Sequence, residues 1–67
     1  MQNTDTTKYY ARQICDRILE SALGINLVNN WWNSHNKAFD TSPIILWETD
    51  YKRVYNYLLD QLNGDYY

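Results

Sequence analysis

The chain has 67 residues, of which 45% are hydrophobic and 16% aromatic, and it carries a formal charge of -2. This length allows one small domain, whose aromatic side chains supply much contact area, so a multidomain enzyme and a disordered chain are both excluded. Basic and acidic residues are interleaved, which excludes the basic cluster used to bind nucleic acid, and no apolar run is long enough to span a membrane.

The residues that usually carry chemistry are scarce. Cys15 is the only cysteine and His35 the only histidine, so neither a disulfide nor a metal site has enough ligands at suitable spacing. We expect Cys15 to act as a small hydrophobic residue and His35 to be a loop residue that bonds to backbone. The sequence therefore predicts a cytoplasmic, non-catalytic protein that needs no cofactor and binds neither nucleic acid nor membrane.

The first helix is predicted over residues 8–23. Residues 1–5 are polar and expected to fray, and an N-cap is expected within residues 5–7. Arg12 and Asp16 are four residues apart and should form a pair on the helix surface. Gly24 is placed to end the helix in a left-handed conformation. The apolar residues at helical spacing are Tyr10, Ala11, Ile14, Cys15, Ile18 and Ala22, with Leu19 on the flank.

Two short helices and a loop are predicted in the middle of the chain. Residues 25–33 form a helix that must depend on packing, because asparagine is a poor helix former. Residues 34–42 are rich in loop-forming residues, and Pro43 is suited to the first position of a short helix over residues 44–48. We expect Trp32 and Phe39 to be buried and to join the flanking helices into one block.

The last helix is predicted over residues 51–62, with Thr49 or Asp50 as its cap and Asn63-Gly64 as its end. Residues 65–67 then form a short tail. The predicted fold is a single all-α domain over residues 1–67, an orthogonal array of about four helices with two longer ones at the ends. The apolar stripe of the last helix contains Tyr51, Val54, Tyr55, Leu58 and Leu62, with Leu59 beside it and Lys52, Arg53, Asn56 and Asp60 opposite.

Four tyrosines, Tyr9, Tyr57, Tyr66 and Tyr67, fall outside the predicted core. Tyrosine is enriched in interface hot spots because it buries a large area at a small entropic cost. These residues could form an interface, or they could cover the flanks of a small domain.

A longer pattern runs through residues 23–64. It consists of a tryptophan, an asparagine loop that ends in alanine and an apolar residue, a Ser-Pro helix start, an acidic cap, and an Arg-Val pair followed by leucines. The pattern resembles the toxin-binding domain of the Xre/MbcA/ParS antitoxin family. The residues that carry it are Trp32, Asn36, Ala38-Phe39, Ser42-Pro43, Thr49-Asp50, Arg53-Val54 and Leu58-Leu59.

The resemblance implies a protein that binds and blocks a RES-domain toxin, which is an NAD-consuming enzyme. It assigns partner binding to the last helix and the tail, and a structural role to the conserved core pattern of the family. The family's usual DNA-binding helix-turn-helix domain is not expected in a chain of this length. The implied partner-binding residues are Arg53, Tyr57, Asp65, Tyr66 and Tyr67, and the implied structural residues are Trp32, Asn36, Phe39, Pro43, Val54 and Leu58.

Two positions depart from the family pattern. His35 stands where a loop proline is usual, and no glycine occurs between Phe39 and Pro43. The alternative to an antitoxin is a small phage-encoded or host-directed protein with the same fold, which binds an unidentified target or associates with itself.

Overall fold

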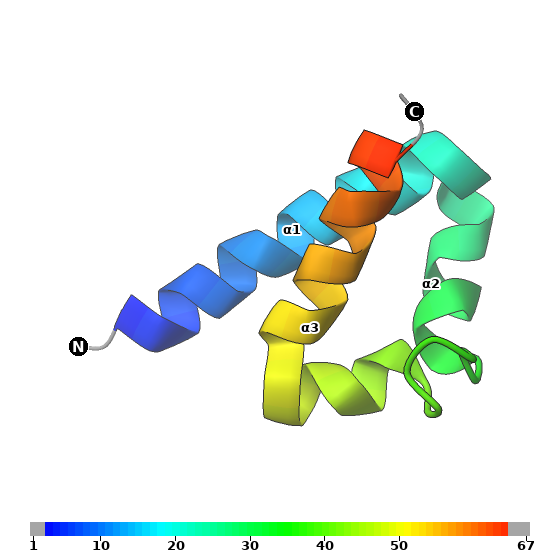
Figure 1. The fold of residues 1–67 in the computed structure, drawn as a ribbon. Coiled ribbons are helices and arrows are strands. Elements are labelled where there is room, and N and C mark those ends of the chain that lie inside the picture. The colour runs from blue at the N-terminus through cyan, green and yellow to red at the C-terminus, as the bar shows by residue number, and fades with distance from the viewer. Residues whose placement is uncertain (1–2, 65–67) are drawn as a thin grey trace.

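Three helices build the protein in the computed structural model, which describes residues 3–64. They are α1 (Asn3–Leu23), α2 (Ile25–Asn33) and α3 (Pro43–Gly64), and the described residues contain no strand. Helix α1 meets α2 at a corner, a loop leads from α2 to α3, and the second half of α3 rises beside α1 (Figure 1). The prediction of an all-α fold is confirmed.

The count of helices differs from the prediction because residues 43–64 are assigned as one element. The expected boundary is still visible at Asp50, whose φ of -151° and ψ of 67° are not helical. The chain turns sharply at this residue, so the two halves of α3 run in different directions (Figure 1). Thr49 does not cap the second half, since its hydroxyl donates a hydrogen bond back to the Leu46 carbonyl at 3.4 Å.

Both terminal helices are longer than predicted. Helix α1 begins at Asn3, so part of the segment expected to fray is helical, and Thr6 and Thr7 lie within the helix and are not caps. Adding turns to an existing helix costs little compared with nucleating one, and this favours the longer helix over the local capping signal. Helix α3 likewise ends at Gly64, two residues beyond the predicted Leu62.

Gly24 makes the corner between α1 and α2. Its amide donates to the Glu20 carbonyl at 2.9 Å, which closes α1, and its carbonyl accepts from the Leu27 amide at 3.1 Å, which opens α2. The predicted positive φ is confirmed at 92°, but ψ is 150°, outside the left-handed helical region. That combination is reserved for glycine, because a Cβ atom would clash with the local backbone.

Replacing Gly24 by alanine should therefore destabilise the protein by about 1 to 3 kcal/mol through backbone strain alone. No atom lies within 4 Å of a Cβ built at this position, so packing does not contribute to the loss. Urea unfolding followed by circular dichroism would measure it. A D-alanine introduced by chemical synthesis favours positive φ and should recover most of the stability; equal losses for the two isomers would contradict the backbone explanation.

The core lies where the three helices converge. As predicted, Trp32 and Phe39 are buried, with 1% and 7% of their surface exposed. The rings of Trp32 and Trp47 meet edge to face with centroids 5.3 Å apart, which joins α2 to the first half of α3. The buried hydrophobic side chains are Ala11, Cys15, Leu19, Trp32, Phe39, Trp47, Val54 and Leu58, and Pro43 is also fully buried.

Asn36 organises the loop between α2 and α3. Its amide donates to the Thr41 carbonyl at 3.0 Å, and its own carbonyl accepts from the amides of Phe39 and Asp40. Its side-chain oxygen accepts from the Ala38 amide at 2.9 Å, a turn that asparagine forms readily. Asp40 takes a positive φ of 58°, so it fills the conformation for which a glycine would be the usual residue. The loop thereby holds Phe39 against the core.

A helix that crosses a membrane must be both long and apolar. Among residues 3–64, no helix combines the length and the apolar character needed to cross a lipid bilayer.

Candidate functional site

A cluster of polar and aromatic side chains fixes α1 to the other two helices. The indole Nε1 of Trp32 donates to Asp16 Oδ1 at 2.7 Å. The Arg12 guanidinium lies 3.9 Å from the centroid of the Trp32 ring, and its Nε is 3.6 Å from the same Asp16 oxygen, which confirms the predicted pair. The Arg12 Nε has no hydrogen-bond partner, so its charge is balanced by Asp16 and the face of the indole.

This attachment sets which face of α1 is covered. Ala11, Cys15 and Leu19 are buried, four residues apart, although Leu19 was expected on the flank. Tyr10 and Ile14 were predicted to be in the core, but they are 57% and 41% exposed, and Ala22 is also exposed. The prediction was wrong here because the apolar stripe of α1 is wider than the surface that α2 and α3 cover.

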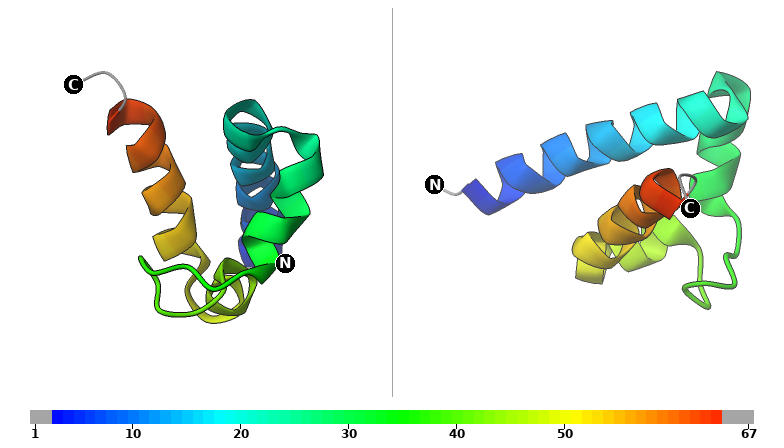
Figure 2. Two further views of the ribbon diagram at one scale, coloured as in Figure 1. Left: turned by 90° about the vertical axis from the view of Figure 1, so that its right-hand side faces the viewer. Right: turned by 45° about the horizontal axis from the view of Figure 1, so that its top comes forward.

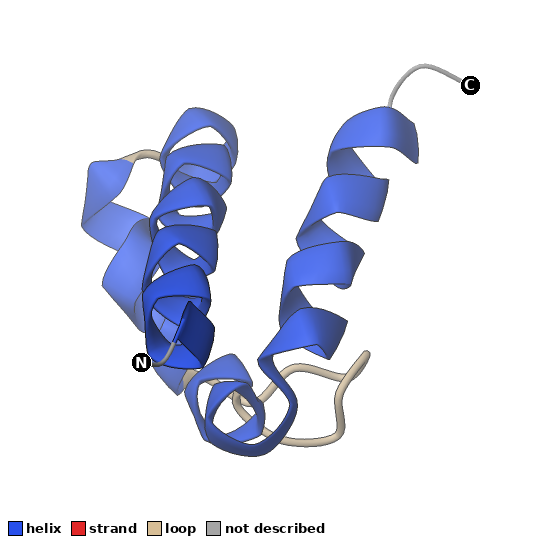
Figure 3. Ribbon diagram, turned by 90° about the vertical axis from the view of Figure 1, so that its left-hand side faces the viewer, coloured by secondary structure: helices blue, strands red, loops and turns tan. Residues whose placement is uncertain are grey.

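Part of the uncovered stripe, at Ile14, faces α3. Seen along α1, the second half of α3 diverges from α1 and α2 above the base formed by the loop and the first half of α3 (Figures 2 and 3). A groove of about 490 Å³ lies between them. We call it the α1–α3 groove; its lining residues are Thr7, Tyr10, Ala11 and Ile14 from α1, and Tyr51, Lys52, Tyr55 and Asn56 from α3.

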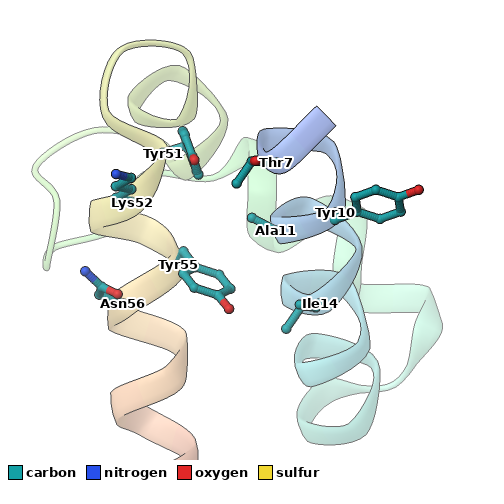
Figure 4. A pocket seen from close by; sticks show the side chains of 8 residues that line it. All are labelled: Thr7, Tyr10, Ala11, Ile14, Tyr51, Lys52, Tyr55 and Asn56. Carbon is teal, nitrogen blue, oxygen red and sulfur yellow. The ribbon is translucent and has the colours of Figure 1, made fainter. Parts of the chain in front are cut away.

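The centre of the α1–α3 groove is apolar and aromatic. Tyr51 and Tyr55 point from α3 into the space that Ala11 and Ile14 face from α1 (Figure 4). Because the Ala11 side chain is small, the groove is deeper at that residue. The ring of Tyr10 points outward at the α1 margin, while Lys52 and Asn56 form the α3 margin (Figure 4).

The walls of the groove carry positive charge in an acidic protein. Residues 6–14 and 51–57 include four basic side chains and no carboxylate, whereas the whole chain has a charge of -2. Arg12 is occupied by Asp16 and Trp32. In the region that the structure covers, Lys8, Lys52 and Arg53 form no ion pair. These three cations can therefore interact with a ligand without first breaking an internal salt bridge.

The residues implied in partner binding have different environments. Arg53 is exposed beside Lys52 on α3, but Tyr57 is half-buried, with its ring edge to face on Phe39 and centroids 5.0 Å apart. Tyr57 is not among the buried core residues, as expected, but it packs against the core because the loop carries Phe39 across to it. Tyr9 is 60% exposed, as expected, and accepts a hydrogen bond from Gln13. Asp65, Tyr66 and Tyr67 lie outside the described residues.

Cys15 is enclosed in the core and has no exposed surface. Burial, helped by the neighbouring Asp16 carboxylate and opposed by Arg12, raises the pKa of its thiol from 9.0 to about 12. The thiol is therefore protonated at neutral pH and unsuited to nucleophilic attack.

We expect Cys15 to be unreactive towards Ellman's reagent in the native protein at pH 8 and to react fully in denaturant. Because the folded pKa is the higher one, the native state holds the proton more tightly, so this contribution to stability is complete below pH 9 and is lost as pH rises towards 12. Tyrosine ionisation acts over the same range. The comparison with Cys15→Ala isolates the thiol: a wild type no steeper in its alkaline loss than this variant would contradict the assignment.

A second exposed apolar surface lies at the corner between α1 and α2. Leu23, Ile25 and Leu27 are 41%, 71% and 49% exposed. His35 lies beyond the opposite end of α2 and pairs with Asp40 at 3.5 Å, and both side chains are largely exposed. Within the described part of the chain, no three His, Cys, Asp or Glu side chains are grouped as metal ligands would be.

Comparison with known proteins gives no relative for this chain. No family model matches it, and no curated protein and no solved structure is significantly similar to it.

Proposed function

We propose that this chain is a non-catalytic protein-binding module whose partner contacts the α1–α3 groove and the adjoining face of α3 that carries Arg53. The observation that carries the proposal is the uncovered apolar centre of the groove, formed by Ile14, Tyr51 and Tyr55 between helices that are otherwise packed. Large aromatic side chains beside unpaired cations are the residue types that dominate binding energy in protein interfaces.

The partner class that we propose is a RES-domain toxin, as the sequence resemblance implies. Support comes from what the matching residues do. Trp32, Phe39, Pro43, Val54 and Leu58 are buried, and Asn36 holds the loop. A protein with the same pattern is expected to form the same scaffold and to present the second half of α3 in the same way.

Neutralisation would then be steric. The second half of α3 ends away from the base of the fold, so its far end can approach a concave active site (Figure 3). An aromatic tail that follows the helix end can occupy the entrance to a nucleotide site and exclude NAD, while Arg53, near the kink, contacts the partner elsewhere along the same helix. Binding of this kind needs no chemistry from the module itself.

The test is co-expression with a RES-domain toxin, read as bacterial growth, cellular NAD and recovery of a complex. The wild type should restore growth, and Arg53→Glu, Ile14→Ser and deletion of residues 65–67 should each weaken the rescue. Ile45→Ser is the matched control for Ile14→Ser, because Ile45 is an isoleucine 61% exposed outside the groove. Failure of the wild type to bind or protect would overturn the proposed partner class.

Self-association is the second candidate function, and the corner formed by Leu23, Ile25 and Leu27 favours it. Leu23 and Leu27 line one shallow pocket and Ile25 is the most exposed of the three, and exposed apolar surface is typical of protein interfaces. Sedimentation velocity should then show a dimer or larger species that Ile25→Ser dissociates. A monomer at all concentrations would eliminate this candidate.

A further inference from the structure

The α1–α3 groove combines an apolar centre with margins of one charge sign. Tyr51, Tyr55 and Ile14 supply the apolar surface, and Lys52 is the only charged residue among the lining side chains that the structure describes. Lys8 and Arg53 lie next to lining residues in the sequence and are also without an ion-pair partner in residues 3–64. A ligand for this site must bury apolar groups and bring negative charge.

The charge beside the groove differs from the charge of the whole protein. Along α1 the nearest carboxylates are Asp5, before the first lining residue, and Asp16, which is already engaged by Arg12 and by the Trp32 indole. On α3 the nearest is Asp50, at the kink where the groove meets its base. Between these carboxylates the charged residues beside the groove are all basic, although the protein as a whole is acidic.

We infer that the α1–α3 groove binds an acidic amphipathic helix of the partner protein. The apolar side chains of such a helix, three and four residues apart, would pack between Tyr51, Tyr55 and Ile14, and its flanking carboxylates would face Lys52 and its basic neighbours. Two helices that diverge from a common base leave a groove in which a third helix can pack, since helix packing inserts the side chains of one helix between those of its neighbours. The inference rests on the proposed function and names the chemistry of the contact.

Charge attraction also distinguishes this ligand from a second copy of the chain. The face of α1 that could enter another copy's groove carries Lys8 and no acidic residue between Thr6 and Ile14. Two such faces would bring like charges together. An acidic helix from a different protein meets no such repulsion.

The experiment uses two designed helical peptides with the same leucine face, one with glutamates and one with lysines at the flanking positions. Binding to the full chain is measured by fluorescence anisotropy, and the site is located from amide chemical shifts. We expect the glutamate peptide to bind more tightly and to shift the amides of residues 7–14 and 51–56. Equal binding of the two peptides, or shifts confined to residues 23–27, would overturn the inference.

Matched variants test the two parts of the contact separately. Lys52→Glu should weaken the glutamate peptide roughly three- to tenfold and improve binding of the lysine peptide, while Lys37→Glu, in the exposed loop, should change neither. Ile14→Ser should weaken both peptides about tenfold and Ile45→Ser neither. If Lys52→Glu bound the glutamate peptide and the lysine peptide as tightly as the wild type does, the inference would be contradicted.

The outcomes separate the two proposals. If the protein neutralises a RES-domain toxin but shows no preference for the glutamate peptide, the inference about the groove falls and the proposed function stands. If the glutamate peptide binds in the groove and no RES-domain toxin is captured, the proposed partner class falls and the chemistry of the site stands. Concentration-dependent self-association that occupies the groove would overturn the inference, because a second copy would then be the ligand.

Discussion

The Trp32→Ala variant is expected to lose about 3 to 5 kcal/mol of unfolding free energy, the usual cost of removing a buried large side chain. A domain of this size has a total stability of about 3 to 10 kcal/mol, so the variant should be largely unfolded or close to it. Trp32 contacts all three helices, since its ring meets Trp47 of α3 and Arg12 of α1, and its Nε1 donates to Asp16. Urea unfolding followed by circular dichroism would measure the loss.

Two further variants keep this prediction testable if Trp32→Ala does not fold. Trp32→Phe retains a ring but removes the N–H donor, and it should cost about 1 to 3 kcal/mol because Asp16 loses a partner in a partly buried site. Trp31→Ala is the matched control, because the neighbouring Trp31 is only half-buried, and its loss should be smaller than that of Trp32→Ala. Similar losses for Trp31→Ala and Trp32→Ala would show that the core is not centred on Trp32.

The Phe39→Ala variant should also lose about 3 to 5 kcal/mol, by the same cavity argument. Its ring is the point at which the loop is attached to the second half of α3, through the contact with Tyr57 at 5.0 Å. Removing it should free the loop as well as open the core. Thermal unfolding by circular dichroism would report the stability, and hydrogen exchange of the Asp40 and Phe39 amides, both bonded to Asn36, would report the loop.

A double-mutant cycle with Tyr57→Ala apportions this loss. Aromatic pairs of this geometry contribute about 0.5 to 1.5 kcal/mol beyond area burial, so the two substitutions together should cost less than the sum of the single losses by that amount. Strict additivity would mean that the loop is held by contacts other than the Phe39 and Tyr57 rings.

Local sequence signals determined much of the fold. Gly24, Pro43 and the stretch from Ser34 to Ser42 mark interruptions in helical periodicity, and the structure ends or begins a helix near each of them. The apolar stripe of the second half of α3 also agrees, with Val54 and Leu58 buried and the opposite side exposed. Such features can be predicted from the sequence because they depend on backbone conformation and on periodicity within one element.

Tertiary structure alone decided which apolar residues are covered. Periodicity placed Tyr10 and Ile14 with Ala11 and Cys15 on one stripe of α1, and nothing within α1 indicates how wide a strip its neighbours will cover. The kink at Asp50 sets the direction of the second half of α3, and the bond from Trp32 to Asp16 sets the rotation of α1. The backbone kink within α3 and the hydrogen bond between the distant residues Trp32 and Asp16 together leave the α1–α3 groove open.

The candidate binding residues were recovered only in part for the same reason. Arg53 is exposed as its position on the helix predicts, because exposure opposite an apolar stripe follows from periodicity. The contact of Tyr57 with the core was not predicted because its partner Phe39 comes from a loop, and the path of a loop is not encoded in helical spacing. The sequence by itself thus determined the helices, the turns and the aromatic core, since each reflects local preference or burial, and tertiary packing decided the groove, since a groove exists only where separate helices fail to meet.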